Sequence, residues 1–512
     1  MKIIEPQREI SVLDEAEVII VGGGPAGIGA ALASARTGAE TILIDRFGSL
    51  GGLQTQGLNS IFAFVDPELH SGIIQELLGH LADAGAMQRS DQLSIGTRST
   101  MKDRFMSTFG AARLPKRMVD TEAGWWGRWG YAFDPEYYKY LLDGLMVQAG
   151  VKLFYHSFAA GAIREDNLLK GVILEGSEGR RAVLGKVVID TTGTGDIVWK
   201  SGAPCSGDEG KPNGTDKGSK GGYLSSFYIG GVDQAKFNQF KAANPDDWAG
   251  MYGGMKILEK GIAAGEYVIV DKIVVAQHWD FYKSGKIWIM TLLHPVSEDC
   301  WKTKDLTAGE IDMRKQAVVI HKLLKENVGG FENSYIDRFT QLALWGNQHR
   351  LIGNHVITYN DMREGKIFED SIAINNMPPD VYEMAGRFAY DILPHDVPYR
   401  SLVSKEVENL MAAGTILSAG PFATNGLRYC TPSICTGQAA GTAAALAVRH
   451  KVTPKNLDAK FVQEELRKQG ARVSVKDVSK EALEPYNFIK KAKVVFRRTE
   501  ENLISEELLG KY

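Results

Sequence analysis

This 512-residue sequence has little of several features that identify common classes of protein. It contains only four cysteines, none of them in a C-x-x-C pair, so neither a disulfide framework nor a zinc or other metal site is expected. No apolar run reaches the roughly 18 residues that cross a membrane. The opening residues also lack the apolar stretch of a secretory signal, and we therefore expect a cytoplasmic protein without a membrane span.

The chain also has little net charge and little proline. The 59 Lys and Arg against 62 Asp and Glu give a net charge of −3, which argues against a nucleic-acid partner because such proteins carry a basic surplus. Proline numbers only 17, whereas glycine numbers 56, about 11% of the chain against an ordinary share of roughly 7%. Glycine in such excess, without a collagen period, indicates close backbone approach or positive φ angles.

The first such place is a complete βαβ unit over residues 17–45. An apolar strand runs into a glycine-rich turn, a helix rich in small residues follows, and a second strand ends at Asp45. Asp45 lies 21 residues after Gly24, close to the roughly 20 of a dinucleotide fingerprint. A ribose hydroxyl can donate to this carboxylate, which repels the 2′-phosphate of NADP and leaves NAD and FAD. The turn comprises Gly22, Gly23, Gly24, Pro25, Ala26 and Gly27.

The glycines of this turn have distinct physical roles. Gly22 permits the tight turn from strand to helix, Gly24 lets the backbone approach a pyrophosphate, and Gly27 lets the helix and the strand pack closely. The N-terminus of the helix then offers free N–H groups and the positive end of its dipole to the phosphates. The unit therefore predicts a bound dinucleotide.

Three further segments of the chain are rich in glycine. Residues 46–52 form a second glycine-rich turn, and a strand over 186–191 runs into a turn at 192–196. Residues 408–447 hold a glycine-containing turn and then a small-residue helix near Gly437, whose free N–H groups we expect to face a carbonyl or a developing negative charge.

Together these motifs resemble those of the FAD-dependent oxidoreductases in the glutathione-reductase-like superfamily, over most of residues 17–450. The resemblance implies an α/β fold, with a Rossmann-like FAD-binding domain built on a parallel sheet, a second α+β substrate domain and a C-terminal helical tail. No flavin-linking His or Cys is evident, so FAD is expected to be non-covalent. The implied cofactor contacts are Gly22, Gly24, Pro25, Ala26, Gly27, Asp45, Arg46, Gly51, Gly52, Leu53, Gln54, Ala159, Thr192, Gly193, Asp196, Gly437, Gln438 and Ala439.

A narrower resemblance covers residues 345–380 and 397–400, and indicates one large subgroup of these flavoproteins whose substrate is unknown. The chain has no second dinucleotide fingerprint and no C-x-x-C pair, so a dedicated NAD(P) domain and thiol–disulfide chemistry are not expected. A dehydrogenase or an oxidase is favoured over a reductase fed by NAD(P)H. The residues that match the subgroup are Arg350, Gly353, Thr358, Asp361, Phe368, Asp370 and Ala373.

Catalysis in this fold needs protein groups that position the substrate and move protons, because the flavin performs the redox chemistry. His349 and Arg350 are the first candidates, as a proton acceptor and as a partner for a carboxylate or the reduced flavin. Tyr399 and Arg400 are the second pair, with packing or a structural ion pair as the alternative role. Further candidates are His278, His294, Asn425, Arg428 and Cys430, and a tryptophan cluster of Trp125, Trp126 and Trp129 that is able to stack on a ring-shaped substrate.

The motifs also predict how the chain is divided. We expect a discontinuous FAD-binding domain of residues 1–222 and 396–452, in which 90–130 are an insertion or lid. A substrate or cap domain of residues 223–395 and a tail of residues 453–512 complete the chain.

The predicted function is an FAD-dependent dehydrogenase or oxidase that transfers a hydride from a small organic substrate to flavin N5. One alternative is an NAD-dependent dehydrogenase, which the first βαβ unit alone does not exclude. Another is a flavoprotein that uses FAD structurally or for non-redox lyase or isomerase chemistry. The sequence specifies neither the substrate nor the electron acceptor, and a homo-oligomer is compatible with it.

Overall fold

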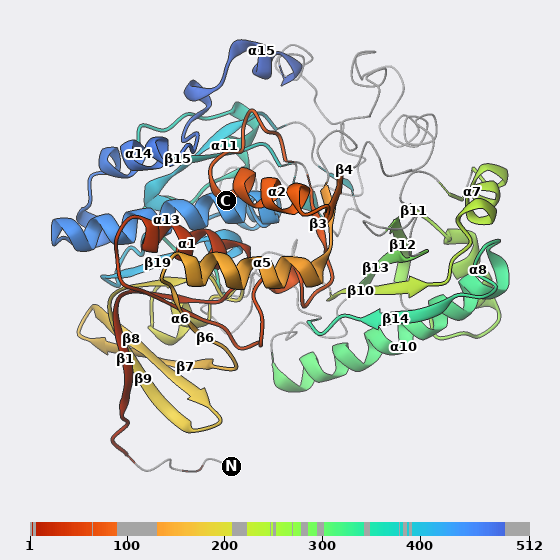
Figure 1. Ribbon diagram of the computed structural model, residues 1–512, viewed down its shortest axis with the longest axis horizontal. Coiled ribbons are helices and arrows are strands. Elements are labelled where there is room, and N and C mark those ends of the chain that lie inside the picture. Colours follow the sequence, from red (N-terminus) through yellow and green to blue (C-terminus); the bar gives the residue numbers. More distant parts are fainter. Residues whose placement is uncertain are drawn as a thin grey trace.

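The structure is a computed structural model. It describes residues 3, 7–63, 65–89, 131–206, 223–245, 247–248, 252–268, 270–277, 285–293, 302–342, 349–377, 379–381, 387–388 and 392–486. The predicted insertion at 90–130 and the tryptophan cluster in it lie outside the described residues, as do His278 and His294. In Figure 1 a larger body that contains both ends of the described chain lies beside a smaller body built around α10.

The larger body is organised by a sheet with the strand order β6–β2–β1–β9–β8–β7, in which β19 also pairs with β9. Strand β1 is parallel to β2 and to β9, and β19 is parallel to β9. The last four residues of β1 are buried, as expected for a parallel strand covered on both faces. The strands are β1 (Val12–Val21), β2 (Thr41–Ile44), β6 (Lys152–Phe154), β7 (Phe158–Glu165), β8 (Leu168–Gly176), β9 (Gly179–Asp190) and β19 (Leu410–Ala412).

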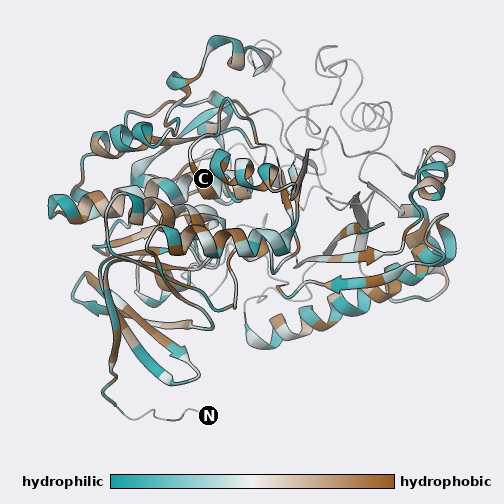
Figure 2. Ribbon diagram, viewed as in Figure 1, coloured by the Kyte–Doolittle hydropathy of each residue, from teal (hydrophilic) through white to brown (hydrophobic). Residues whose placement is uncertain are grey.

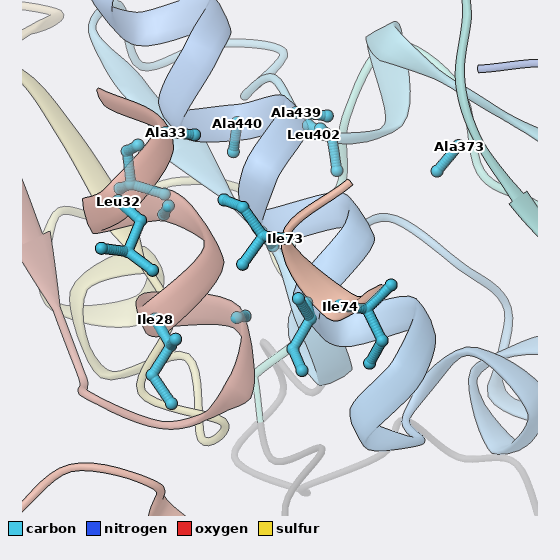
Figure 3. Packing of buried hydrophobic residues seen from close by; sticks show 14 of the residues in the cluster. Ile28, Leu32, Ala33, Ile73, Ile74, Ala373, Leu402, Ala439 and Ala440 are labelled. Carbon is cyan, nitrogen blue, oxygen red and sulfur yellow. The ribbon is translucent and has the colours of Figure 1, made fainter. Parts of the chain in front are cut away.

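Two helices from opposite ends of the chain pack closely against each other beside this sheet. Helix α1 (Pro25–Arg36) meets α13 (Cys430–His450) where both carry glycine. A Cβ on Gly441 would lie 2.0 Å from the carbonyl oxygen of Ala30, so only glycine allows this approach. Figure 3 shows side chains of α1, α13 and α2 (Ile73–Asp83) meeting in the core, among them Ile28, Leu32, Ile73, Ala439 and Ala440.

The smaller body is an antiparallel sheet in the order β11–β12–β13–β10–β14, with its own core. Helix α10 (Thr303–Asn327) carries hydrophilic and hydrophobic residues together (Figure 2), and buries Met313, Ala317, Ile320 and Leu324 at helical spacing. The other elements are β10 (Tyr223–Gly230), β11 (Tyr252–Gly253), β12 (Val270–Gln277), β13 (Ile287–Leu293), β14 (Tyr335–Phe339), α7 (Gln234–Ala243) and α8 (Met255–Ala263).

Short elements complete the larger body. No helix among the described residues is long and apolar enough to cross a membrane. The short strands are β3 (Ile61–Phe62), β4 (Met87–Arg89), β5 (Tyr131–Phe133), β15 (Ser371–Asn375), β16 (Asp380–Val381), β17 (Arg387–Phe388) and β18 (His395–Pro398), and the remaining helices are α5 (Pro135–Gln148), α6 (Asp196–Lys200), α11 (Tyr359–Glu364), α12 (Pro421–Leu427), α14 (Ala459–Lys468) and α15 (Lys480–Leu483).

These two bodies confirm the predicted α/β fold, but the core of the larger body includes residues from beyond the predicted limits of the FAD-binding domain, and the limits themselves stay a prediction. Ile357, Met362 and Ile372 join the core of the larger body, although they precede the predicted limit at residue 395. Val462 and Leu466 of α14 join the same core, so this part of the predicted tail is integral to the larger body. The difference arises because turns and isolated bridges connect residues 349–370 to that body, and such contacts leave no periodic pattern in a sequence.

Candidate cofactor-binding site

The first glycine turn is built by close contacts within the protein. Gly22 has a φ of +105°, and a Cβ there would lie 2.6 Å from the carbonyl oxygen of Thr191. A Cβ on Gly27 would lie 1.8 Å from the carbonyl oxygen of Gly22. The Thr191 hydroxyl donates to that same oxygen at 2.7 Å. Gly22 therefore allows the turn to pass close to Thr191 with a positive φ, and Gly27 allows the helix to pack against the end of the strand.

Gly24 differs from its neighbours because a side chain there would meet no described residue. It is the N-cap of α1, and a Cβ there would have no atom of the described residues within 4 Å. Pro25 begins the helix, and the N–H groups of Ala26 and Gly27 have no acceptor within it. The turn therefore presents bare backbone and the positive end of a helix dipole, which suits a phosphate.

The second glycine turn lies directly against the first. The Gly51 N–H donates to the Gly23 carbonyl oxygen at 2.8 Å, and both Gly51 and Gly52 have positive φ. A Cβ on Gly52 would lie 3.0 Å from the Cα of Gly24. Leu53 and Gln54 follow in a short 3-10 helix over Gly52–Gln54.

Gln54 is the clearest sign of a missing partner in this turn. Its side chain is 2% exposed, and neither polar atom of its amide has a hydrogen-bond partner among the described residues. Leaving a buried polar group unpaired costs about 1–3 kcal/mol. A ligand with hydrogen-bonding atoms would remove this cost.

Asp45 holds the first turn in place from the end of β2. Its carboxylate accepts from the Gly23 N–H at 2.6 Å and from the Phe47 N–H at 2.7 Å, while burial raises its pKa.

Arg46 is exposed and its guanidinium lies over the Phe47 ring, 5.1 Å from the ring centroid. Ala159 is buried on β7, where its carbonyl oxygen accepts from Lys200.

The third turn, residues 192–196, has open space at a glycine, as at Gly24, and a polar side chain without a described partner, as at Gln54. Gly193 has a φ of +75°, and a Cβ there would meet no described atom within 4 Å. The Thr192 hydroxyl oxygen accepts from the N–H groups of Gly195 and Asp196 at 3.0 and 3.1 Å. The Asp196 side chain has no hydrogen-bond or ion-pair partner among the described residues. This turn therefore combines open backbone with a carboxylate that is able to accept bonds.

A fourth segment, residues 413–416, completes the site. The Ala413 N–H donates to the Asp190 carbonyl oxygen at 3.2 Å, which places the segment beside the third turn. Gly414 has a positive φ, and a Cβ there would lie 2.8 Å from the Cβ of Ala26. Thr415 follows it in a 3-10 helix. All four segments thus meet at the N-terminus of α1.

One predicted part of the cofactor site lies within a helix, and its role as a cofactor contact stays a prediction. Gly437, Gln438 and Ala439 lie inside α13, which begins at Cys430, so their backbone N–H groups do not open toward a ligand. Gly437 packs on Ala26 instead, and the Gln438 amide accepts from the Ile73 N–H at 3.1 Å and donates to Gln469 at 3.0 Å. Gly437 therefore lets α13 pack directly against the first turn of α1.

The structure brings His349 and Arg350 next to the third turn. The His349 N–H donates to the Thr194 carbonyl oxygen at 3.1 Å, and its ring stacks on Trp199 with centroids 5.2 Å apart. Arg350 is 1% exposed, and its Nε donates to the Ala419 carbonyl oxygen at 3.2 Å. Their chemical roles stay predictions.

Tyr399 and Arg400 have the packing roles that were the alternative to catalysis. The buried Tyr399 hydroxyl donates to the Pro454 carbonyl oxygen at 2.7 Å. Arg400 is exposed, pairs with Asp370 at 3.5 Å, and lies over the Phe368 ring. These contacts engage the polar groups of both side chains with C-terminal and surface residues, and a catalytic role for either residue stays a prediction.

The subgroup-specific segment is also structural where its contacts are described. Thr358 and Asp361 form the capping box of α11. The Asp361 carboxylate further contacts Lys366 at 3.1 Å and His355 at 3.5 Å. Hydrogen bonds from these neighbours hold the pKa of Asp361 well below its usual range despite burial. Thr358 and Asp361 therefore stabilise a local conformation.

Sequence reasoning missed Asp190 and Thr191, which connect the turns. Their signal was present in the sequence, since an acidic residue at the end of a buried apolar strand requires a partner. The glycines that follow give a stronger signal, which predicts the turn but not the residues that hold it.

The sequence of the chain was compared with protein families and with curated proteins. A family model described as FAD dependent oxidoreductase matches residues 17–466. No curated protein matches the chain.

Solved structures with some similarity include three oxidoreductase-related proteins. A geranylgeranyl bacteriochlorophyll reductase-like protein from Thermoplasma acidophilum is 14% identical, with 97% of this chain and 95% of that chain covered and a TM-score of 0.43. A p-nitrophenol 4-monooxygenase from Pseudomonas putida is 12% identical, with coverages of 95% and 91% and a TM-score of 0.43. L-proline dehydrogenase from P. horikoshii is 14% identical, with coverages of 90% and 99% and a TM-score of 0.37.

TM-scores this low carry no argument about the reaction, and membership of the glutathione-reductase-like superfamily stays a prediction. The family model, in contrast, spans most of the chain and includes all four segments of the site. The chain belongs to the FAD dependent oxidoreductase family, and its cofactor is FAD.

Proposed function

We propose that the protein is a dehydrogenase or an oxidase that removes a hydride from a small organic substrate, with FAD held non-covalently across the four segments. One observation carries the proposal. Gly24 and Gly193 meet no described atom where a side chain would stand, and the buried Gln54 amide of the second turn has no described hydrogen-bond partner. When bound, FAD supplies the two-electron chemistry.

The residues fit the separate parts of such a cofactor. The N–H groups of Ala26 and Gly27 would hold the phosphates, and Asp45 would accept from a ribose hydroxyl. The carboxylate of Asp196 and the amide of Gln54, which has no described partner, would bind the hydroxyl groups and ring atoms beyond the phosphates.

The cysteines support non-covalent binding. Burial raises the pKa of Cys430 to about 11 and that of Cys435 to about 12, so both are protonated thiols at neutral pH. A thiol is a poor nucleophile compared with its thiolate, and is therefore a poor candidate for a covalent link to the flavin.

His349 is our proposed base, because imidazole accepts protons near neutral pH and this residue lies against the third turn. The buried Arg350 would stabilise negative charge beside it. A His349→Gln variant should keep FAD and lose about 10²-fold or more in the rate of flavin reduction. An unchanged rate would remove His349 from the mechanism.

The test of the proposal begins with the purified protein, which should be yellow and release FAD on acid treatment. A colourless protein that gains neither colour nor stability with FAD would contradict it, and release of NAD would favour the NAD-dependent alternative. Anaerobic screening of alcohols, amines and hydroxy acids should then find a substrate that bleaches the flavin.

The same screen separates the remaining possibilities. A flavin that dithionite reduces but no substrate reduces would favour the non-redox alternative. Once a substrate is known, oxygen consumption identifies an oxidase, whereas turnover only with an artificial electron acceptor identifies a dehydrogenase.

A further inference from the structure

Asp190 is a fully buried carboxylate that none of the proposed cofactor contacts uses. It stands at the end of β9 with 0% exposure. One carboxylate oxygen accepts from the Thr192 N–H at 3.0 Å and from the Thr192 hydroxyl at 2.7 Å. The other accepts from the N–H groups of Ile197 and Val198 at 2.7 and 2.8 Å. Both oxygens thus fasten the backbone on either side of the third turn.

The backbone of Asp190 connects this turn to two other segments. In the sheet register Asp190 lies opposite Val21 of β1 and opposite Ala412 of β19. Its carbonyl oxygen accepts from the Ala413 N–H at 3.2 Å, and the hydroxyl of the next residue, Thr191, donates to Gly22. A single position therefore joins the first turn, the third turn and the fourth segment.

We propose that Asp190 is a positioning residue for the cofactor, whose carboxylate holds residues 192–196 in the shape that turns the Gly193 backbone and the Asp196 side chain toward FAD. This inference rests on the proposed placement of FAD at these turns. It assigns Asp190 no contact with FAD or with substrate.

A carboxylate is needed because four donors converge on it. An amide at this place accepts only through its oxygen, and its NH₂ group would face two donors. The geometry of the turn should therefore suffer in an Asp190→Asn variant even though the volume of the side chain is unchanged.

Protonation would have a related effect. Burial and the nearby charge of Asp196 raise the pKa of Asp190 to about 6. Among the described residues, Asp196 on α6 is the ionisable group whose charge acts on Asp190. His349 bonds to this turn through its backbone, and β1 and β19 place the apolar Val21 and Ala412 opposite Asp190. A proton on Asp190 removes one acceptor, so FAD affinity should fall between about pH 7.5 and pH 5.0, by roughly tenfold for a group with this pKa.

The experiment compares FAD binding by apoprotein of the wild type, Asp190→Asn and Asp396→Asn across this pH range. Asp396 is a matched control, because it is also 0% exposed and accepts from Ser474, Val475 and Phe368 at 2.7 to 3.1 Å. We expect Asp190→Asn to bind FAD at least about tenfold more weakly at pH 7.5 and to lose the pH dependence. Asp396→Asn should lower the melting temperature but keep the FAD affinity and pH profile of the wild type.

The outcomes are distinguishable. Failure of the wild-type protein to bind FAD would overturn the proposed function and this inference together. Normal FAD binding by the wild type, with Asp190→Asn behaving like Asp396→Asn, would overturn only the inference and leave Asp190 a stabilising residue. If Asp190→Asn does not fold, Thr192→Val decides, because it removes one of the four bonds to the carboxylate together with the bonds that the Thr192 hydroxyl accepts from Gly195 and Asp196. FAD affinity within about twofold of the wild type after losing all of these bonds would then refute the inference.

Discussion

Gly24 and Gly27 lie in the same turn, but replacing each by alanine should have a different effect, on FAD binding at Gly24 and on folding at Gly27. Gly24 has an ordinary φ of −73°, and its new methyl group would meet no described atom. The methyl group on Gly27 would overlap the Gly22 carbonyl oxygen, 1.8 Å away. The first change should therefore affect the cofactor alone, whereas the second should affect the fold.

The magnitudes follow from these contacts. A methyl group forced against a bound phosphate costs about 1–3 kcal/mol, which is about 5- to 150-fold in FAD affinity for Gly24→Ala. The free energy of unfolding of that apoprotein should change by less than about 1 kcal/mol, since alanine and glycine differ by no more than this at an N-cap. Gly27→Ala must separate helix from strand, and we expect a loss of about 3 kcal/mol or more.

Two measurements on apoprotein check these values. Titration with FAD, followed by quenching of flavin fluorescence, gives the affinity, and urea unfolding followed by circular dichroism gives the stability. Wild-type FAD affinity in Gly24→Ala would refute the idea that this turn approaches the cofactor. Wild-type stability in Gly27→Ala would refute the packing argument for that position.

Three other predictions concern residues away from the FAD contacts. Burial lowers the pKa of His395 to about 4, so its contribution to stability is complete above about pH 6.5 and is lost toward pH 4; in urea unfolding, His395→Gln should reduce this acid dependence by up to about 1.4 kcal/mol per pH unit, and an unchanged slope would contradict the argument. Gly441→Ala, which overlaps the Ala30 carbonyl oxygen, should lose about 1–3 kcal/mol of stability or more in the same assay; full stability would mean that the helices do not pack as described. Tyr399→Phe should lose about 0.5–1.5 kcal/mol with its bond to Pro454 and retain its rate of flavin reduction, whereas a large loss of rate would restore a catalytic role.

The first βαβ unit could be predicted closely because its signals are local. A buried apolar strand, a glycine turn with Pro25 at the first helical position and a second strand follow one another within residues 17–45. The roles of Gly22 and Gly27 also follow from geometry that every such unit shares. These features need no information about the remainder of the chain.

The start of α13 could not be predicted in the same way. Pro432 lies near the beginning of a helix that starts at Cys430, where a missing N–H group breaks no helical hydrogen bond. Gly437 and the small residues after it resemble a glycine-containing turn that leads into a helix, and this resemblance predicts a later start with Gly437 at the flavin. The bond from Tyr399 to Pro454 was equally invisible, because it joins residues far apart in the chain.

The contact between α1 and α13 has a consequence for synthesis of the protein. The helix that would hold the phosphates ends at Arg36, but the helix that supports it ends only at His450. At about 5–20 residues per second, a ribosome needs roughly 20–80 s to add the intervening chain. During this time the first βαβ unit lacks both its helical support and the fourth segment. A nascent chain therefore cannot load FAD into a complete site, and incorporation of the cofactor must follow the emergence of the C-terminal quarter.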